Sequence, residues 1–251
     1  NRSIKSFKIN GVKVKNGILK NKVNNFYKSY FKYKKYNLPF VTSKLAVSKD
    51  LYTINNKKRW ITNEFSRARV HLMRSYHDCI ITSSATVNAD NPRLTCRING
   101  LLKRSPSRII LDNKLKINVN SLLIKYSKRP RTIIFYNKNN IKKINILKKL
   151  NIKTYYIPLD NNGNLNLNKV LLKAKKLGYS RIFVEAGKKL TSGFLNNNLV
   201  DKFVLYVSNY KLAKYGKANI KDYLKKYLRN KKAHIAKVNL FGEKLLSYKI
   251  K

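Results

Sequence analysis

Acidic residues are scarce in this sequence. Its 251 residues include 10 Asp and Glu against 57 Lys and Arg, which gives a formal net charge of +47. Such an excess is typical of proteins that bind nucleic acid or an anionic membrane surface. Here, however, most basic residues are lysines spread along the whole chain among many Asn and Ile, and all three types have A/T-rich codons. We therefore interpret the charge as a lysine-coated surface, and we expect only weak, salt-sensitive binding and no specific nucleic-acid partner.

Cysteine and long apolar runs are also scarce. Cys79 and Cys96 are too few for a disulfide scaffold, so we expect a reducing, cytoplasmic setting. No apolar run approaches the roughly 20 residues that cross a membrane, and the N-terminus lacks a signal-peptide core, so we expect a soluble protein without a membrane partner. Neither H-x-E nor P-C-x-x-C occurs, and we expect no metal site.

The most informative stretch is residues 79–97. It begins with Cys79-Ile80-Ile81, a short β-branched run typical of a buried strand. Small hydroxylated residues follow, then Asp90, the turn signal Asn91-Pro92, and Arg97. Hydroxyl groups and an arginine just beyond a strand end suit a phosphorylated ligand. A solvated turn after a core strand fits the same spacing equally well.

Strands alternate with helices along most of the chain, which predicts an α/β fold with a mostly parallel sheet. The expected strands and helices lie at 39–50, 63–76, 108–112, 131–137, 139–150, 152–159, 168–177, 181–184 and 201–207. Asp50, Asp112 and Glu185 each end an apolar strand, at the sheet edge where ligands bind in open α/β folds. No G-x-G-x-x-G fingerprint occurs, which argues against a Rossmann domain.

Two further features point to the carboxyl ends of the strands. Lys44 stands inside an otherwise apolar strand, and a lysine there is paired, functional, or extended to the surface; we favour function. In residues 181–195, a strand runs into Glu185, then Gly187, then a helix. Glycine at such a turn lets backbone N–H groups approach a phosphate, although many α/β turns contain glycine without that role.

These segments together resemble the reductase domain of the bifunctional riboflavin-biosynthesis deaminase/reductase. ATVNADNPRLTCR, from residue 85, is similar to that family's A-T-V-x-x-D-[DN]-P-x-L-T-x-R, and KLAVSKD, from residue 44, is similar to K-L-[AG]-x-S-L-D-G. Residues 60–62 match W-I-T, and 181–195 resemble the family's V-E-[GA]-G turn. The resemblance implies a three-layer dihydrofolate-reductase-like fold over 38–251, preceded by an N-terminal extension, 1–37, at the family's junction between deaminase and reductase.

The resemblance also implies an activity. The family reduces 5-amino-6-(5-phosphoribosylamino)uracil with NADPH to 5-amino-6-(5-phosphoribitylamino)uracil, a step of riboflavin biosynthesis, by hydride transfer to C1′ of the ring-opened ribosyl group. It further implies a homodimer and, since the zinc motifs of the deaminase are missing, a separate deaminase that supplies the substrate. Two alternatives remain: a degenerate, non-catalytic basic protein that binds nucleic acid, and a dihydrofolate reductase. The ATVNADNPRLTCR segment and the E-A-G turn argue against the latter.

The resemblance assigns roles to individual residues. Those implied in catalysis are Lys44, Asp90 and Glu185. Those implied in substrate binding are Lys58, Arg74, Leu94, Arg97 and Glu185, with Arg74 and Arg97 as a clamp on the 5-phosphate. Those implied in cofactor binding are Ala46, Trp60, Thr86, Asp90, Asn113, Gly187, Lys188, Lys189, Leu190, Thr191, Ser192 and Gly193.

The two ends of the chain carry weaker patterns. Around Gly11 and Gly17 the sequence suggests one or two short strands. Residues 20–36 have a helical spacing of apolar and aromatic residues, which we interpret as a stripe facing the core; these are Val23, Phe26, Tyr27, Tyr30 and Phe31. The tail, 234–251, predicts two strands joined at Gly242.

Overall fold

A nine-stranded sheet forms the centre of the computed structural model, which describes residues 2–251. The strand order is β10-β11-β8-β1-β7-β3-β4-β5-β6. The parallel strands are β1 (Phe40–Val47), β3 (Cys79–Ser83), β4 (Ser107–Leu111), β5 (Thr132–Tyr136), β6 (Lys153–Tyr156), β7 (Arg181–Glu185) and β8 (Lys202–Val207). Two antiparallel strands, β10 (Ala233–Ile235) and β11 (Lys244–Lys249), complete one edge. The predicted α/β fold with a mostly parallel sheet is confirmed.

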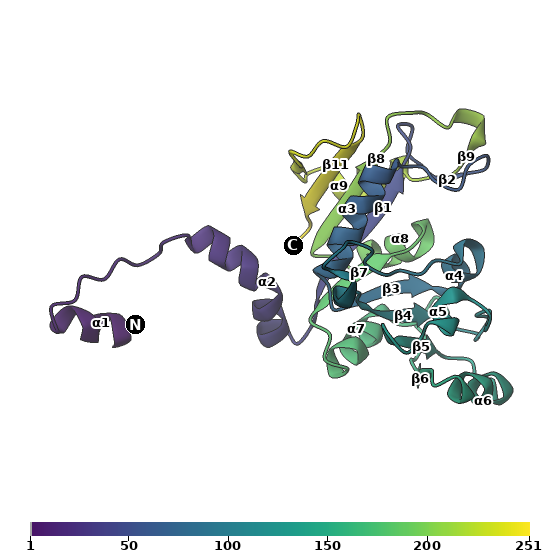
Figure 1. Ribbon diagram of the computed structural model, residues 1–251, viewed down its shortest axis with the longest axis horizontal. Coiled ribbons are helices and arrows are strands. Elements are labelled where there is room, and N and C mark those ends of the chain that lie inside the picture. Colours follow the sequence, from purple (N-terminus) through teal and green to yellow (C-terminus); the bar gives the residue numbers. More distant parts are fainter. Residues whose placement is uncertain (1) are drawn as a thin grey trace.

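Helices cover both faces of the sheet, so the fold has three layers (Figure 1). The helices packed on one face are α7 (Leu167–Lys176), α8 (Lys188–Asn196) and α9 (Lys221–Leu228). Those on the other face are α3 (Glu64–Ser75), α4 (Ser84–Asp90), α5 (Leu122–Lys125) and α6 (Ile141–Lys149). Side chains alternate along each strand, so that Cys79 and Ile81 join one core and Ile80 the other. No helix of the described chain is both long and apolar enough to cross a bilayer.

Smaller elements surround the strand ends. A separate two-stranded sheet pairs β2 (Tyr52–Asn55) with β9 (Gly216–Asn219), and single 3-10 turns lie at η1 (Leu102–Arg104) and η2 (Ala213–Tyr215). The hairpin between β10 and β11 turns at Gly242, whose φ is +86°, as the tail pattern predicts. L side chains rarely adopt such an angle, which is the physical reason for glycine there.

Side-chain caps explain where the helices next to the site begin. The Asn63 side chain accepts a hydrogen bond from the Ser66 amide at 2.9 Å, so α3 begins where the sequence predicts. The hydroxylated residues after β3, expected as a turn, instead form α4. Their helix begins because the Ser83 hydroxyl accepts a bond from the Thr86 amide at 3.2 Å.

The N-terminal arm differs from the expectation. Turns and irregular chain over 10–19 replace the strands expected around Gly11 and Gly17. Helix α1 (Arg2–Ile9) precedes this segment, and α2 (Lys20–Tyr36) forms as predicted. Figure 1 shows both helices reaching away from the sheet. The aromatic stripe of α2 is exposed, so its predicted core-facing orientation is wrong. Charged groups join α2 to the body: Lys32 pairs with Asp201, and the Arg181 guanidinium donates to the Ser29 hydroxyl. The Lys175 ammonium also lies 4.4 Å from the Tyr33 ring.

His77, between α3 and β3, gives the fold a dependence on pH. Its ring stacks on Phe183 with a centroid distance of 4.9 Å, and Nδ1 donates to the Met73 carbonyl at 2.7 Å. Burial lowers the pKa of His77 from 6.5 to about 4, although the Met73 carbonyl opposes this shift. The folded state therefore holds His77 neutral, while the unfolded chain takes up a proton below about pH 6.5.

We predict that acid weakens the fold through this residue. The contribution of His77 is present above pH 6.5 and is lost as the pH falls toward 4, so the free energy of unfolding should drop by about 2 kcal/mol between pH 7 and pH 5. Urea denaturation at both values measures the drop. In His77→Phe, which keeps the stacking but cannot be protonated, the drop should shrink. An unchanged drop in the variant would contradict the assignment.

Candidate active site

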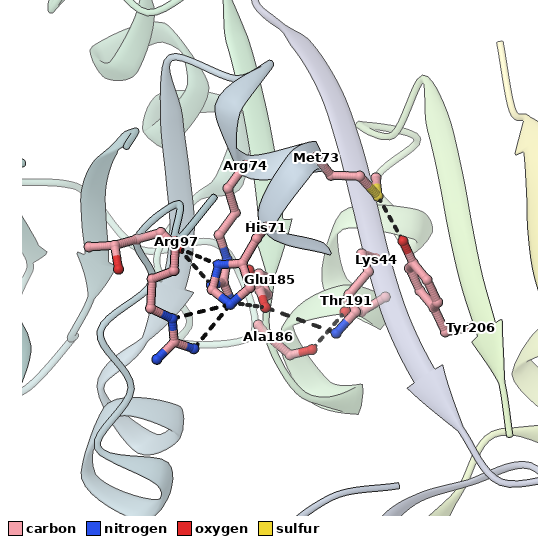
Figure 2. Close-up of polar contacts among 10 residues, drawn as sticks. Lys44, His71, Met73, Arg74, Arg97, Glu185, Ala186, Thr191 and Tyr206 are labelled. Atoms are coloured by element: carbon pink, nitrogen blue, oxygen red, sulfur yellow. Dashed lines mark hydrogen bonds and ion pairs between the residues drawn. The ribbon is translucent and has the colours of Figure 1, made fainter. Parts of the chain in front are cut away.

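Lys44, inside β1, lies beside Glu185 at the carboxyl end of β7. They are register partners of the parallel pair β1 and β7, and Lys44 Nζ lies 3.9 Å from Glu185 Oε1. Both side chains are mostly buried. The Lys44 ammonium also lies 5.9 Å from the centroid of the Tyr206 ring. The structure thus brings together two of the three predicted catalytic residues (Figure 2).

Arg74 is the closer partner of Glu185. From α3, its Nε donates to Oε2 at 2.9 Å and its Nη2 to Oε1 at 2.8 Å, a two-pronged pair. Its Nη1 donates to the Thr95 carbonyl at 2.9 Å. Arg74 is buried, and these contacts use most of its donors. Arg74 therefore fixes Glu185 in place, and Lys44 is the more weakly held member of the cluster.

Burial and charge set the protonation of the cluster. Burial would raise the pKa of Glu185, but the bonds and charge of Arg74, together with Lys44, bring it down to about 2. Burial lowers the pKa of Lys44; Glu185 opposes this, and the Arg74 charge adds to it. Glu185 is therefore a carboxylate at neutral pH, and Lys44 holds its proton less firmly than an exposed lysine does.

Arg97 and His71 form the outer side of the cluster. Arg97 is exposed, and its Nη2 and Nε lie 3.0 and 3.2 Å from His71 Nε2. His71 lies one turn before Arg74 on α3 and separates the two arginines (Figure 2). Of the predicted clamp, Arg97 remains open to a ligand, whereas the Arg74 guanidinium is taken up by Glu185 and Thr95.

Two of the predicted cofactor residues lie near one arginine. The Arg59 guanidinium lies 4.9 Å from the Trp60 ring, and its Nη2 donates to the Asp90 carbonyl at 2.8 Å. Asp90 ends the short helix α4, which also carries Thr86. Trp60 is 50% exposed, and the guanidinium of Arg67, from α3, lies 5.0 Å from its ring. Within residues 2–251, no hydrogen bond or ion pair joins the Asp90 carboxylate to Lys44 or Glu185.

The turn from β7 into α8 holds most of the other predicted cofactor residues. Gly187 is the N-cap of α8 and offers no side-chain acceptor, so the first-turn amides are free to donate. The Lys188 side chain points toward β9, because its Nζ donates to the Asn219 carbonyl at 2.7 Å. A Cβ on Gly193 would lie 3.3 Å from Leu167, so packing against α7 explains that glycine. Lys189 is exposed, and Leu190, Thr191 and Ser192 are partly or fully buried.

The remaining predicted residues are spread around the carboxyl ends of the strands. Asn113 follows β4 and donates to the Gly163 carbonyl at 3.1 Å. Leu94 has φ +50° and is buried, with its side chain packed in the core. Ala46 lies on β1 two residues after Lys44, and Lys58 is exposed in the loop after β2.

The strand-end acids Asp50 and Asp112 anchor loops. Asp50 accepts from the Ser48 hydroxyl at 2.6 Å and from the Ala213 amide at 2.8 Å. Asp112 accepts from the Ile117 amide at 2.7 Å and from the Ser84 hydroxyl at 3.0 Å. Their bonds hold the backbone around the site, and only Glu185 among the strand-end acids joins the cationic cluster.

Sequence reasoning missed His71. A signal was present, because His71 and Arg74 are three residues apart and share one face of a predicted helix. It also missed Tyr206, whose hydroxyl lies 3.3 Å from Met73 Sδ and whose ring helps to cover Lys44.

Comparison with known proteins decides the family. A family model described as the RibD C-terminal domain matches residues 39–239. The chain belongs to this family. The match begins one residue after the expected boundary at 38, and the division into domains stays a prediction.

Relatives resemble the chain over most of its length. It is 29% identical to the riboflavin biosynthesis protein RibD of Bacillus amyloliquefaciens, over 78% of the chain and 52% of the relative. It is 32% identical to RibD of Buchnera aphidicola subsp. Baizongia pistaciae, over 85% of the chain and 60% of the relative. A 5-amino-6-(5-phosphoribosylamino)uracil reductase of Buchnera aphidicola subsp. Acyrthosiphon pisum is 26% identical over 61% of the chain and 76% of the relative. The chain therefore spans about half the length of the RibD proteins that it matches.

Solved structures share the fold. RibD of Acinetobacter baumannii superposes with a TM-score of 0.77 at 20% identity, over 100% of this chain and 68% of that one. The riboflavin biosynthesis reductase Rib7 of Saccharomyces cerevisiae superposes with a TM-score of 0.66 at 19% identity, over 91% and 99%. The likeness confirms the reductase-type, dihydrofolate-reductase-like fold expected from the resemblance.

We predict that Glu185 stabilises the fold much more than Lys44 does. Glu185→Gln leaves two buried cations without their anion, which should cost about 3–5 kcal/mol of unfolding free energy. Lys44→Met removes a desolvated charge 3.9 Å from its partner and should cost much less. Urea denaturation measures both, with Glu64→Gln, an exposed acid of α3, as the control. The opposite order of the two losses would contradict this picture of the cluster.

Proposed function

We propose that this chain reduces 5-amino-6-(5-phosphoribosylamino)uracil to 5-amino-6-(5-phosphoribitylamino)uracil with NADPH. The observation that carries the proposal is the buried cluster of Lys44, Glu185 and Arg74 at the carboxyl end of β7, with Arg97 exposed beside it. Membership of the RibD C-terminal domain family supports the reaction, as does the similarity to a relative named for it. The alternatives are a dihydrofolate reductase, against which the ATVNADNPRLTCR segment and the E-A-G turn argue, and a degenerate nucleic-acid-binding protein.

Lys44 is the group that we assign to proton transfer. When bound, NADPH supplies the hydride that reduces C1′ of the ring-opened ribosyl group. Hydride addition to an imine carbon leaves the nitrogen in need of a proton. Because its pKa is lowered, Lys44 can give up a proton from Nζ more readily than an exposed lysine.

Glu185 orients the substrate in this proposal. Its two oxygens accept from Arg74, but each carboxylate oxygen has a second lone pair. Those lone pairs can accept from ribose hydroxyl groups, and the low pKa keeps the group in the accepting form. The Arg74 fork fixes the direction in which they point, which favours one arrangement of the substrate beside Lys44.

The residues around α8 and Trp60 suit the cofactor. The free amides after Gly187 are donors for a phosphate, and a Cβ at Gly187 would meet no atom within 4 Å, so the approach to them is open. The half-exposed Trp60 ring, with Arg59 and Arg67 guanidinium groups 4.9 and 5.0 Å from it, offers an aromatic surface and positive charge. We assign the nicotinamide side to Trp60 and α4, and the phosphates to the start of α8.

We further propose a homodimer in the cytoplasm and a deaminase that supplies the substrate. A Thermotoga maritima protein with this fold is named as a deaminase together with the reductase, and the family match here is to a C-terminal domain. Two buried free cysteines fit a reducing compartment.

NADPH consumption tests the proposal. The purified chain should oxidise NADPH when the deaminated pyrimidine substrate is added, and mass spectrometry should detect the ribitylamino product. NADH and dihydrofolate serve as control reactants. Oxidation that depends on dihydrofolate instead, or none with the pyrimidine, would refute the proposal.

Arg97 should govern substrate affinity. Arg97→Ala removes charge-assisted bonds to the 5-phosphate, worth about 1.5–3 kcal/mol, so KM for the substrate should rise roughly 10- to 150-fold while Kd for NADPH stays nearly constant. Arg104→Ala, an exposed arginine of η1, is the matched control. If NADPH affinity falls instead, Arg97 belongs to the cofactor site.

A further inference from the structure

His71 has contacts that fix its chemical form. Nδ1 lies 2.8 Å from the Thr95 carbonyl oxygen, and Nε2 lies 3.0 and 3.2 Å from two nitrogens of Arg97. A carbonyl only accepts, so Nδ1 must carry the hydrogen; a guanidinium only donates, so Nε2 must present its lone pair. Arg74 Nη1 also lies 3.2 Å from Nδ1, but it donates to the Thr95 carbonyl at the shorter distance of 2.9 Å. The neutral imidazole with hydrogen on Nδ1 is therefore the form that satisfies the contacts with Thr95 and Arg97.

The surroundings favour that neutral form. Arg74 faces His71 from the same helix, Arg97 from the loop after α4, and Glu185 from β7. The charges of Arg67 and Arg93 also act on Arg97. Burial lowers the pKa of His71, and the arginines outweigh the opposing effect of the Thr95 carbonyl and Glu185.

His71 is the one polar partner of the Arg97 guanidinium within the described chain. Without it, the exposed side chain of Arg97 would be free to adopt other rotamers, and a ligand would have to order it on binding. The Thr95 carbonyl, which also accepts from Arg74, sets the orientation of the imidazole ring.

We propose that His71 is a positioning residue, which as a neutral imidazole orients Arg97 toward the substrate's phosphate. The inference rests on the proposed function, because it gives Arg97 that phosphate as its ligand. His71 connects Arg97 to the buried cluster. The Thr95 carbonyl accepts from the His71 ring and from Arg74, and the other side of the ring accepts from Arg97.

Two variants of His71 test the proposal. A glutamine side chain can donate to Thr95 and accept from Arg97, which reproduces both contacts without titration, whereas His71→Leu reproduces neither. His71→Leu should raise KM for the substrate roughly three- to tenfold, the cost of ordering one long side chain, with kcat and Kd for NADPH within about twofold. His71→Gln should restore KM. In an Arg97→Ala background, His71→Leu should have no further effect on KM.

A second measurement does not depend on the reaction. Nitrogen-15 NMR of the unmodified chain at neutral pH should show His71 with its hydrogen on Nδ1 and a bare Nε2. Sulfate, which stays a dianion, should bind the unmodified chain and His71→Gln more tightly than His71→Leu. If the chain proves inactive but these results hold, the proposed function fails and the role of His71 in orienting Arg97 stands. An imidazolium, hydrogen on Nε2, or a His71→Gln variant that behaves like His71→Leu would overturn the inference.

Discussion

The buried pair of Arg74 and Glu185 is the interaction on which the site depends. Its two parallel hydrogen bonds join α3 to the end of β7, and the third bond of Arg74 reaches the loop at Thr95. Neutralising Glu185 alone would leave Arg74 and Lys44 as neighbouring cations in a desolvated place, which is far more costly than leaving either in water. Because Arg74 already neutralises Glu185, Lys44 lies beside the carboxylate with a lowered pKa. Arg74 and His71 lie on the same helix, so the pair also places His71 between Glu185 and Arg97.

Most of the buried and partly buried carboxylates in this cationic chain accept hydrogen bonds from backbone N–H groups. Asp50 and Asp112 accept backbone N–H groups, Asp201 accepts from the Val41 amide and pairs with Lys32, and Glu243 accepts from the Asn63 amide at the start of α3. Glu185 is the acid that faces a cluster of cations. The large net charge therefore lies mainly on the surface, and the chemistry at the sheet edge depends on a local balance of three charges.

Much of the architecture could be predicted from sequence because it rests on local patterns. β-branched runs predicted the strands, and Asn63 predicted the start of α3. The alternation of strands and helices predicted the parallel sheet. The exposure of the α2 stripe could not be predicted, because helical spacing shows which residues share a face and not what covers that face. Likewise, Arg74 is a conspicuous cation in the sequence, but only the tertiary fold shows that Glu185 occupies its guanidinium. Leu51 stands where the resembled family has glycine, and it keeps the left-handed turn, with φ +69°.

The central claim is that Glu185 is held by Arg74 while Lys44 transfers the proton. The pH dependence of kcat, measured for the unmodified chain and for Lys44→Met with saturating NADPH and pyrimidine substrate, tests it most directly. The account predicts that kcat of the unmodified chain falls on the alkaline side with a midpoint below 10.5, the ordinary value for lysine, because burial lowers the pKa of Lys44. Lys44→Met should be slow and lack that alkaline fall. A variant that keeps the full rate and the same profile would contradict the account.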